Sequence, residues 1–147
     1  MTSLVVGVGQ VDRGDDAVGP LVVARLSGAP PEGVDVALVP TPVRLADAWE
    51  GYDHVVVVDA LRSGRPPGEV TVWVLTDAPL PARPGAGGTH GFGVAEAVEL
   101  ARAMHRLPRR LVLVGIEAAG FAHGVPLSPE VVAALPAAER AVRDAAS

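Results

Sequence analysis

Two adjacent carboxylates, Asp15 and Asp16, are the first residues of the chain whose types and spacing could do chemistry. They follow a short apolar run that ends at Gly7 and Gly9, and a segment with helical periodicity begins directly after them. Negative charge at the start of a helix repels phosphate and attracts a cation. A single aspartate at such a position is explained as a helix cap. We assign the cap to Asp15, which leaves Asp16 as a candidate metal ligand.

The glycine pair also resembles the opening of a dinucleotide-binding loop. That fingerprint requires a third glycine three positions after Gly9, where this sequence has Asp12. The chain therefore does not match the dinucleotide-binding pattern, and the carboxylates are the better guide to a site.

Asp59 and His90 are the other two residues whose context favours chemistry. Asp59 ends the most apolar, β-branched run of the chain, and His90 stands shortly before a predicted helix. Because the carboxyl ends of parallel strands meet at one edge of a sheet, we expect Asp16 and Asp59 to lie at the same edge. Taken alone, Asp59 could instead be a polar residue at a strand exit, and His90 a solvated loop residue.

His90 can join the aspartates only if the chain returns to their edge of the sheet. Residues 69–75 are predicted to run antiparallel to the preceding strand, which would leave the chain at the opposite edge. The segment from Asp77 to Thr89 can span up to about 40 Å at ~3.3 Å per residue, against roughly 23 Å for a seven-residue strand. The predicted site therefore consists of Asp16, Asp59 and His90.

Two carboxylates and one imidazole form a ligand set that leaves metal coordination positions open. The chain has no cysteine, so thiolate ligands and a thiolate nucleophile are excluded. The set suits zinc, nickel, manganese or iron. A serine hydrolase is disfavoured because the G-x-S-x-G pattern is absent. Since proton and metal compete for His90, activity should fall below about pH 6, while aspartates with pKa near 4 remain ionised.

Composition argues against several classes of partner. The chain has 147 residues and a net charge of -5, and its 12 basic residues are all arginines scattered along the sequence. Few aromatic residues and no basic face argue against nucleic acid. There is no apolar run of about twenty residues and no basic leader at the start. We expect a single domain over residues 1–147, in the cytoplasm, without membrane contact.

The hydrophobic periodicities predict an α/β fold, a three-layer sandwich in which a mostly parallel, twisted sheet of about five strands carries helices on both faces. Strands are expected from residue 4 to the glycine pair and at 34–39, 54–59, 69–75 and 111–117. Helices are expected at 17–27, 43–49 and 94–105, and then on either side of Pro136, which should end or kink a helix. The 54–59 strand should be central and the 69–75 strand should lie near an edge. Residues 76–93 should form a long loop of the kind that is usually functional or disordered.

Several segments, in their order and spacing, resemble the hydrogenase maturation endopeptidases. They are Gly7-Val8-Gly9, Arg13-Gly14-Asp15-Asp16-Ala17-Val18-Gly19, Val58-Asp59-Ala60, Thr89-His90-Gly91-Phe92-Gly93 and Gly115-Ile116-Glu117. The resemblance covers nearly the whole chain. It implies the sandwich described above, and an endopeptidase that removes a C-terminal extension from the precursor of the large subunit of nickel-iron hydrogenase once nickel has been inserted.

By this resemblance, Asp16, Asp59 and His90 match the metal-contacting residues of the family. The metal that they meet is then the nickel carried by the substrate, and another divalent metal would suit the same ligands. Cleavage would use the metal as a Lewis acid, without a protein nucleophile. A non-cleaving module or chaperone that recognises a metallated partner needs the same ligands and is the alternative. Glu117 is either an assisting base or a buried structural carboxylate.

Two positions depart from the family pattern. Gln10 stands where the family often has asparagine, and Val39-Pro40-Thr41-Pro42-Val43 stands in place of a glycine-rich loop. That loop is where the partner would be recognised, so the sequence leaves the identity of the target protein open.

Overall fold

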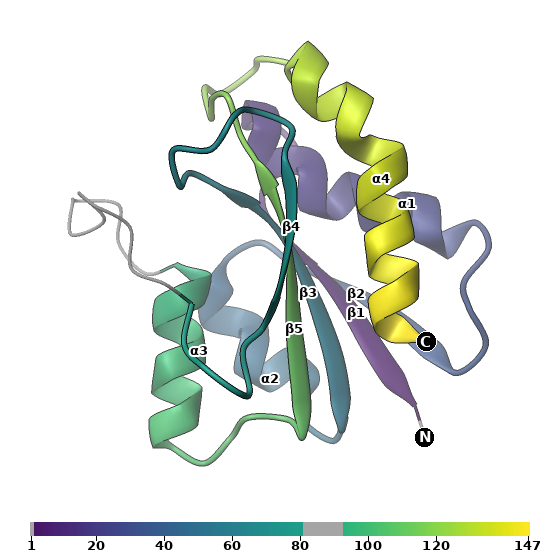
Figure 1. Ribbon diagram of the computed structural model, residues 1–147, viewed down its shortest axis with the longest axis vertical. Coiled ribbons are helices and arrows are strands. Elements are labelled where there is room, and N and C mark those ends of the chain that lie inside the picture. Colours follow the sequence, from purple (N-terminus) through teal and green to yellow (C-terminus); the bar gives the residue numbers. More distant parts are fainter. Residues whose placement is uncertain (1, 81–92) are drawn as a thin grey trace.

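Five strands form one sheet in the computed structural model, which describes residues 2–80 and 93–147. The strands are β1 (Ser3–Val8), β2 (Val34–Val39), β3 (His54–Leu61), β4 (Val70–Val74) and β5 (Arg110–Glu117). Their order across the sheet is β2-β1-β3-β5-β4, so β3 is central, as predicted (Figure 1). Only β4 is antiparallel, and it pairs with β5 at one edge. The mostly parallel sheet and the reversed fourth strand are therefore confirmed.

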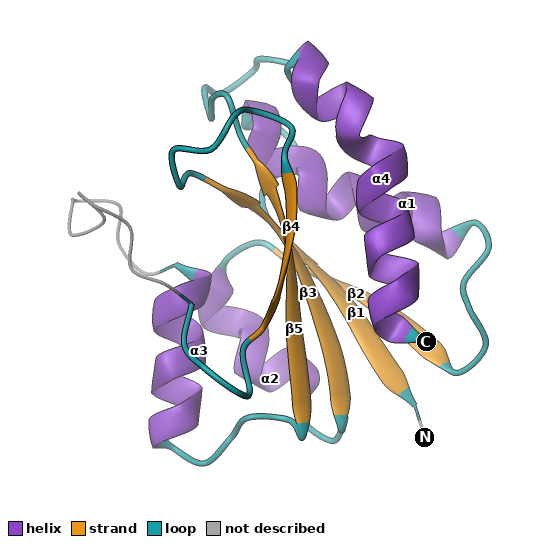
Figure 2. Ribbon diagram, viewed as in Figure 1, coloured by secondary structure: helices purple, strands orange, loops and turns teal. Residues whose placement is uncertain are grey.

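Helices cover both faces of this sheet and complete the predicted three-layer sandwich (Figure 2). They are α1 (Val18–Ser27), α2 (Leu45–Trp49), α3 (Val94–Ala103) and α4 (Pro129–Ala146). α1 and α4 lie on one face, and α2 and α3 on the other. Alternate residues of β3 supply the two cores: Val56 and Val58 pack with α1 and α4, whereas Val55 and Val57 pack with α2 and α3. All four valines are fully buried, as expected of a central parallel strand.

The start of α1 lies closer to the sheet than a side chain would allow. A Cβ atom at Gly19 would lie 2.6 Å from the main-chain oxygens of Val8 and Val58. Real Cβ atoms do not make such contacts, so only glycine permits this approach to the end of β1 and to Val58 within β3. α1 is preceded by a short 3₁₀ helix, η1 (Gly14–Ala17), so the helical segment begins earlier than the predicted residue 17 and starts with tighter geometry.

The prediction of separate helices on either side of Pro136 is wrong, because α4 continues through this residue. The buried residues of α4 recur at helical spacing on both sides of the proline. They are Val131, Ala134, Ala138, Val142 and Ala146. Pro136 itself is exposed, so the hydrogen bond that it cannot donate is lost on the solvent side, while the apolar face holds both halves on the sheet.

The remaining elements follow the prediction with small shifts. The predicted helix at 43–49 consists of a 3₁₀ turn, η2 (Pro42–Arg44), and α2. Residues 81–92 of the predicted loop at 76–93 lie outside the described residues. Within residues 2–80 and 93–147, no helix combines the length and the apolar character that a membrane crossing needs.

Replacing Pro136 with alanine should stabilise the protein. Pro136→Ala restores a main-chain donor within α4, and the gain is partly offset because the unfolded chain becomes more flexible. We expect the free energy of unfolding in urea to rise by about 1–2 kcal/mol with an unchanged m-value. Pro129→Ala is the matched control, since a proline in the first turn of a helix costs no hydrogen bond and its replacement should bring no gain. An equal gain in both variants would contradict this account.

Candidate functional site

Asp16 and Asp59 lie close together at the carboxyl edge of the parallel strands. β1 ends at Val8, and η1, which carries Asp16, follows after a short turn. Gly7 pairs in register with Val58, so Asp59 is level with the end of β1. The two side chains are near enough for the charge of Asp16 to act on the Asp59 carboxyl. The sequence predicts that Asp59 ends its strand. β3 instead continues to Leu61, so Asp59 lies within the strand.

Asp16 is held through one of its two carboxylate oxygens. The main-chain N–H of Gln10 donates to Oδ2 over 2.8 Å, and Nη1 of Arg13 lies 3.9 Å from the same oxygen. Within the described residues, Oδ1 has no hydrogen-bond donor. Because Gln10 contributes its main chain, the replacement of the family's asparagine does not affect this contact. Within residues 2–80 and 93–147, one oxygen of Asp16 is thus held in place and the other accepts no hydrogen bond.

Arg13 is a charged neighbour of the site to which the sequence analysis gave no role. The 3₁₀ geometry of η1 brings residues three apart onto one side, which places Arg13 beside Asp16. Its Nε is buried and has no partner among the described residues. The i, i+3 spacing of a basic and an acidic residue was the available signal, but helical periodicity alone does not predict a 3₁₀ turn.

Gly9 allows η1 to fold back over the end of β1. Its φ of 141° is a conformation that other residues rarely adopt. A Cβ atom at this position would collide with the main-chain oxygen of Asp16. The second glycine of the first motif therefore brings the backbone of Asp16 close to the strand.

The electrostatic environment of Asp59 disfavours its charge. Burial raises the pKa of this carboxyl well above its ordinary value, and the negative charge of Asp16 raises it further. A main-chain hydrogen bond from Ala60 opposes the change only in part. The expectation that both aspartates titrate near pH 4 is therefore wrong for Asp59. The Asp59 carboxyl therefore holds its proton to higher pH than an isolated aspartate does.

Asp15 does not cap the helix, contrary to the prediction. η1 and α1 have no side-chain cap, and the Asp15 carboxylate is instead buried against the segment that follows β5. It accepts N–H bonds from Ala119 (2.7 Å), Gly120 (3.2 Å) and Ser128 (2.7 Å), and the Ser128 hydroxyl lies 2.9 and 3.0 Å from its two oxygens. Burial alone would raise the pKa of Asp15. The hydrogen bonds from Ser128, Ala119 and Gly120 outweigh burial and lower the pKa.

Glu117 is a structural carboxylate, the second of the two roles considered for it. It is only 3% exposed and lies at the end of β5. It accepts the main-chain N–H of Ser63 over 2.8 Å and the Ser63 hydroxyl over 2.5 Å. Its oxygens therefore hold the connection after β3.

His90 lies outside the described residues, so its place in the site stays a prediction. Within the part of the chain that the structure describes, no three His, Cys, Asp or Glu side chains gather as a metal site. His105 and His123 are exposed. His54 is in register with Ser3 and Arg110 at the amino ends of the strands, opposite the aspartates. The described residues thus supply the two carboxylates of the predicted set.

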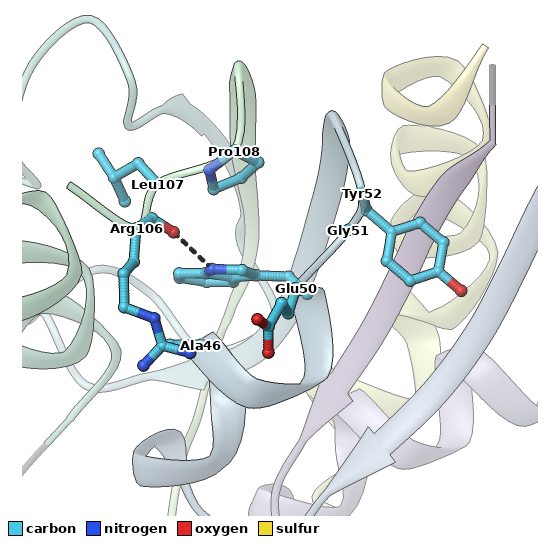
Figure 3. A pocket seen from close by; sticks show the side chains of 8 residues that line it. Ala46, Glu50, Gly51, Tyr52, Arg106, Leu107 and Pro108 are labelled. Atoms are coloured by element: carbon cyan, nitrogen blue, oxygen red, sulfur yellow. Dashed lines mark hydrogen bonds between the residues drawn. The ribbon is translucent and has the colours of Figure 1, made fainter. Parts of the chain in front are cut away.

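The described cavities do not coincide with the aspartates. One of about 200 Å³ lies beside Trp49 after α2, where the indole N–H donates to the main-chain oxygen of Arg106 over 2.9 Å (Figure 3). Another, of about 180 Å³, lies between α2 and α3. Both lie beside packed helices, and neither is lined by Asp16 or Asp59.

The sequence of the chain matches one known protein family. The family described as hydrogenase maturation protease (HycI) matches residues 40–145, which is most of the chain. The chain belongs to the hydrogenase maturation protease family. This confirms the resemblance found in the sequence motifs.

Solved structures of the family share the fold over nearly the whole chain. The hydrogenase maturating endopeptidase HybD from Escherichia coli is 25% identical, with a TM-score of 0.78, and the match covers 99% of this chain and 91% of HybD. A hydrogenase 2 maturation peptidase from a Thaumarchaeota archaeon is 28% identical, with a TM-score of 0.73, over 99% and 97% of the two chains. The [NiFe] hydrogenase maturation protease HybD from Thermococcus kodakarensis is 25% identical, with a TM-score of 0.73, over 100% of both chains. No curated protein sequence matches the chain.

Neutralising Asp59 should stabilise the protein near neutral pH. Its pKa in the folded protein lies above the value in the unfolded chain, so the stability of the wild type falls as the pH rises through the folded-state pKa. Asp59→Asn removes this loss and should raise the free energy of unfolding at pH 7.5 by on the order of 1 kcal/mol. Thermal unfolding at pH 7.5 and pH 4 measures the difference, which should vanish at the lower pH.

Asp53→Asn, in the turn before β3, is the control for this experiment. Its side chain is exposed, and its neutralisation should leave both unfolding temperatures nearly unchanged. A destabilised Asp59→Asn protein at pH 7.5 would show that the Asp59 charge is compensated in the fold.

Proposed function

We propose that the protein is the endopeptidase that removes the C-terminal extension from a nickel-loaded precursor of a hydrogenase large subunit, by metal-assisted hydrolysis of the peptide bond. The supporting observation is the carboxylate pair Asp16 and Asp59, placed at the carboxyl edge of the sheet in a chain with the fold of the maturation proteases. The precursor is the proposed partner, and the cytoplasm is the proposed location.

In this proposal Asp16, Asp59 and His90 contact the nickel that the substrate carries. The free oxygen of Asp16 and the protonatable carboxyl of Asp59 suit a cation, because a cation between them would relieve their repulsion and release the proton. Three ligands leave coordination positions for the peptide, and a divalent cation there supplies Lewis-acid chemistry. The chain itself binds and orients the metal and the scissile bond, and needs no nucleophile of its own.

The position of α3 supports the assignment of His90. Asp59 shares the side of β3 on which Val55 and Val57 lie, because side chains alternate along a strand. That side is covered by α3, which begins at Val94, four positions after His90. A ligand supplied just before α3 would therefore approach the sheet from the same side as Asp59.

Removing either carboxylate should abolish processing of the precursor. Asp16→Asn and Asp59→Asn should each slow cleavage by more than the roughly 10- to 100-fold that loss of an outer-shell partner costs a metal site. Intact-mass analysis of a nickel-loaded large-subunit precursor, incubated with each variant, measures the loss of the C-terminal segment. Asp12→Asn is the matched control, since this exposed carboxylate belongs to the same turn and should leave the rate unchanged.

Two outcomes of this experiment would count against the proposal. Cleavage by Asp16→Asn at the wild-type rate would remove the metal site from the mechanism. Tight association of the wild-type protein with a precursor of unchanged mass would instead identify a binding module that recognises the metallated partner without cutting it.

The acid limb of the pH profile should contain two groups. His90 has a reference pKa near 6.5, and the pKa of Asp59 is raised by burial and by Asp16, so both can take up a proton as the pH falls. At pH values below the pKa values of both groups, the logarithm of kcat/KM should therefore fall with a slope steeper than one. In His90→Gln the residual cleavage should be slower. The slope of its acid limb should correspond to one proton fewer than in the wild type. His123→Gln, which changes an exposed histidine, should keep the wild-type rate and slope. An unchanged profile in His90→Gln would reduce the site to its two carboxylates.

A further inference from the structure

The buried carboxylate of Asp15 joins two segments that are far apart in the sequence. The residue is 1% exposed, and the N–H groups of Ala119, Gly120 and Ser128 converge on its carboxylate. The main chain adds two further bonds between the same segments. The Asp15 N–H donates to the oxygen of Gly120 over 3.0 Å, and the N–H of Gly124 donates to the oxygen of Asp12 over 2.7 Å. The turn before α1 is thus held to residues 118–128 by hydrogen bonds at Asp12 and at Asp15.

Residues 118–128 also contact the segment that follows Asp59. The N–H of Ala118 donates to the oxygen of Leu61 over 2.8 Å. The guanidinium of Arg62 lies 5.1 Å from the centre of the Phe121 ring, within the range of a cation–π interaction. Residues 118–128, which we call the brace, therefore contact both parts of the chain that carry the aspartates.

η1 needs such external support to hold Asp16 in one position. It has four residues, lacks a side-chain cap and has the weaker hydrogen-bond geometry of a 3₁₀ helix. Asp15 and Asp16 are adjacent in it, so the anchor and the candidate ligand move as one piece. The contact from the Gln10 N–H to Asp16 Oδ2 depends on where η1 lies.

We propose that Asp15 is a positioning residue that, through the brace, fixes Asp16 relative to Asp59. The charge of Asp15 is essential to this role, because several N–H donors converge on its two oxygens. In Asp15→Asn the amide would direct its own N–H groups at one or more of these donors. The brace would then shift, and η1 with it. Asp15 touches neither the metal nor the peptide bond, so it is not a catalytic residue.

Nuclear magnetic resonance of the intact protein tests the proposal without a measurement of enzymatic activity. In Asp15→Asn the amide proton of Gln10 should move upfield and exchange with solvent at least about tenfold faster, since its bond to Asp16 loosens although Asp15 does not contact it. If the amides of Ala119, Gly120 and Ser128 change while that of Gln10 keeps its wild-type shift and exchange rate, Asp15 only tethers the brace and the proposal fails.

Three variants keep this test decisive. Ser128→Ala removes only the hydroxyl from Asp15, so it should give a smaller change of the same kind at Gln10, even if Asp15→Asn does not fold. Ser128→Thr keeps the hydroxyl and should restore the wild-type spectrum. Glu139→Gln weakens carboxylate contacts between α1 and α4 without touching η1, and should leave the Gln10 amide unchanged. A Gln10 amide that stays at its wild-type shift in both Ser128→Ala and Asp15→Asn overturns the proposal.

The kinetic arm rests on the proposed function. Asp15→Asn should lower kcat for precursor cleavage about 10- to 100-fold and leave KM within about twofold, because the reacting groups are misplaced while the docking surface is intact. A rise in KM at unchanged kcat would assign Asp15 to substrate binding instead. If the wild-type protein does not cleave the precursor, the proposed function fails, whereas the change at Gln10 still decides the role of Asp15.

Discussion

The approach of main chain to main chain at Gly19 is the constraint on which the rest of this structure depends. Because Gly19 has no Cβ, the start of α1 can lie against the carbonyl oxygens of Val8 and Val58. Val8 ends β1, and Val58 directly precedes Asp59 in the neighbouring strand β3. This contact fixes η1 above the sheet edge and brings Asp16 to the level of Asp59. A larger residue at this position would lift the helix away from the strands and separate the two carboxylates. The close packing needed for the fold and the geometry needed for chemistry thus have the same cause.

The carboxylate pair shows that the fold tolerates an unfavourable arrangement at this edge. Burial and the neighbouring charge of Asp16 both disfavour ionisation of Asp59, and no basic side chain among the described residues contacts Asp59 to compensate. Asp15, one residue before Asp16, is in the opposite situation, since its hydrogen bonds favour the charged form despite burial. The carboxylates near this edge therefore have different tasks: Asp15 stabilises the structure, and Asp59 carries electrostatic strain of the kind that is concentrated at functional sites.

Hydrophobic periodicity predicted the sandwich, the central β3 and the reversed β4, because those features depend on local patterns and on connection lengths. It also predicted that Asp16 and Asp59 lie at one edge, since that follows from parallel strands. The role of Asp15 could not be predicted, because its partners Ala119 and Ser128 lie more than a hundred residues away and offer mainly main-chain N–H groups, which every residue has. Pro136 was misjudged because helix propensity is local, whereas packing against the sheet is not.

The corner of the molecule formed by the end of β2 and η2 has a consequence for evolution. Most residues of β2 are at least partly exposed, and η2 contributes no buried residue, so little of the folding free energy depends on the stretch between Val39 and Leu45. Mutations can accumulate there without unfolding the protein or moving the aspartates, which belong to β3 and η1. The replacement of a glycine-rich loop by a proline-containing one is a change of this tolerated kind. A lineage can therefore change this corner while it inherits the carboxylate pair unchanged.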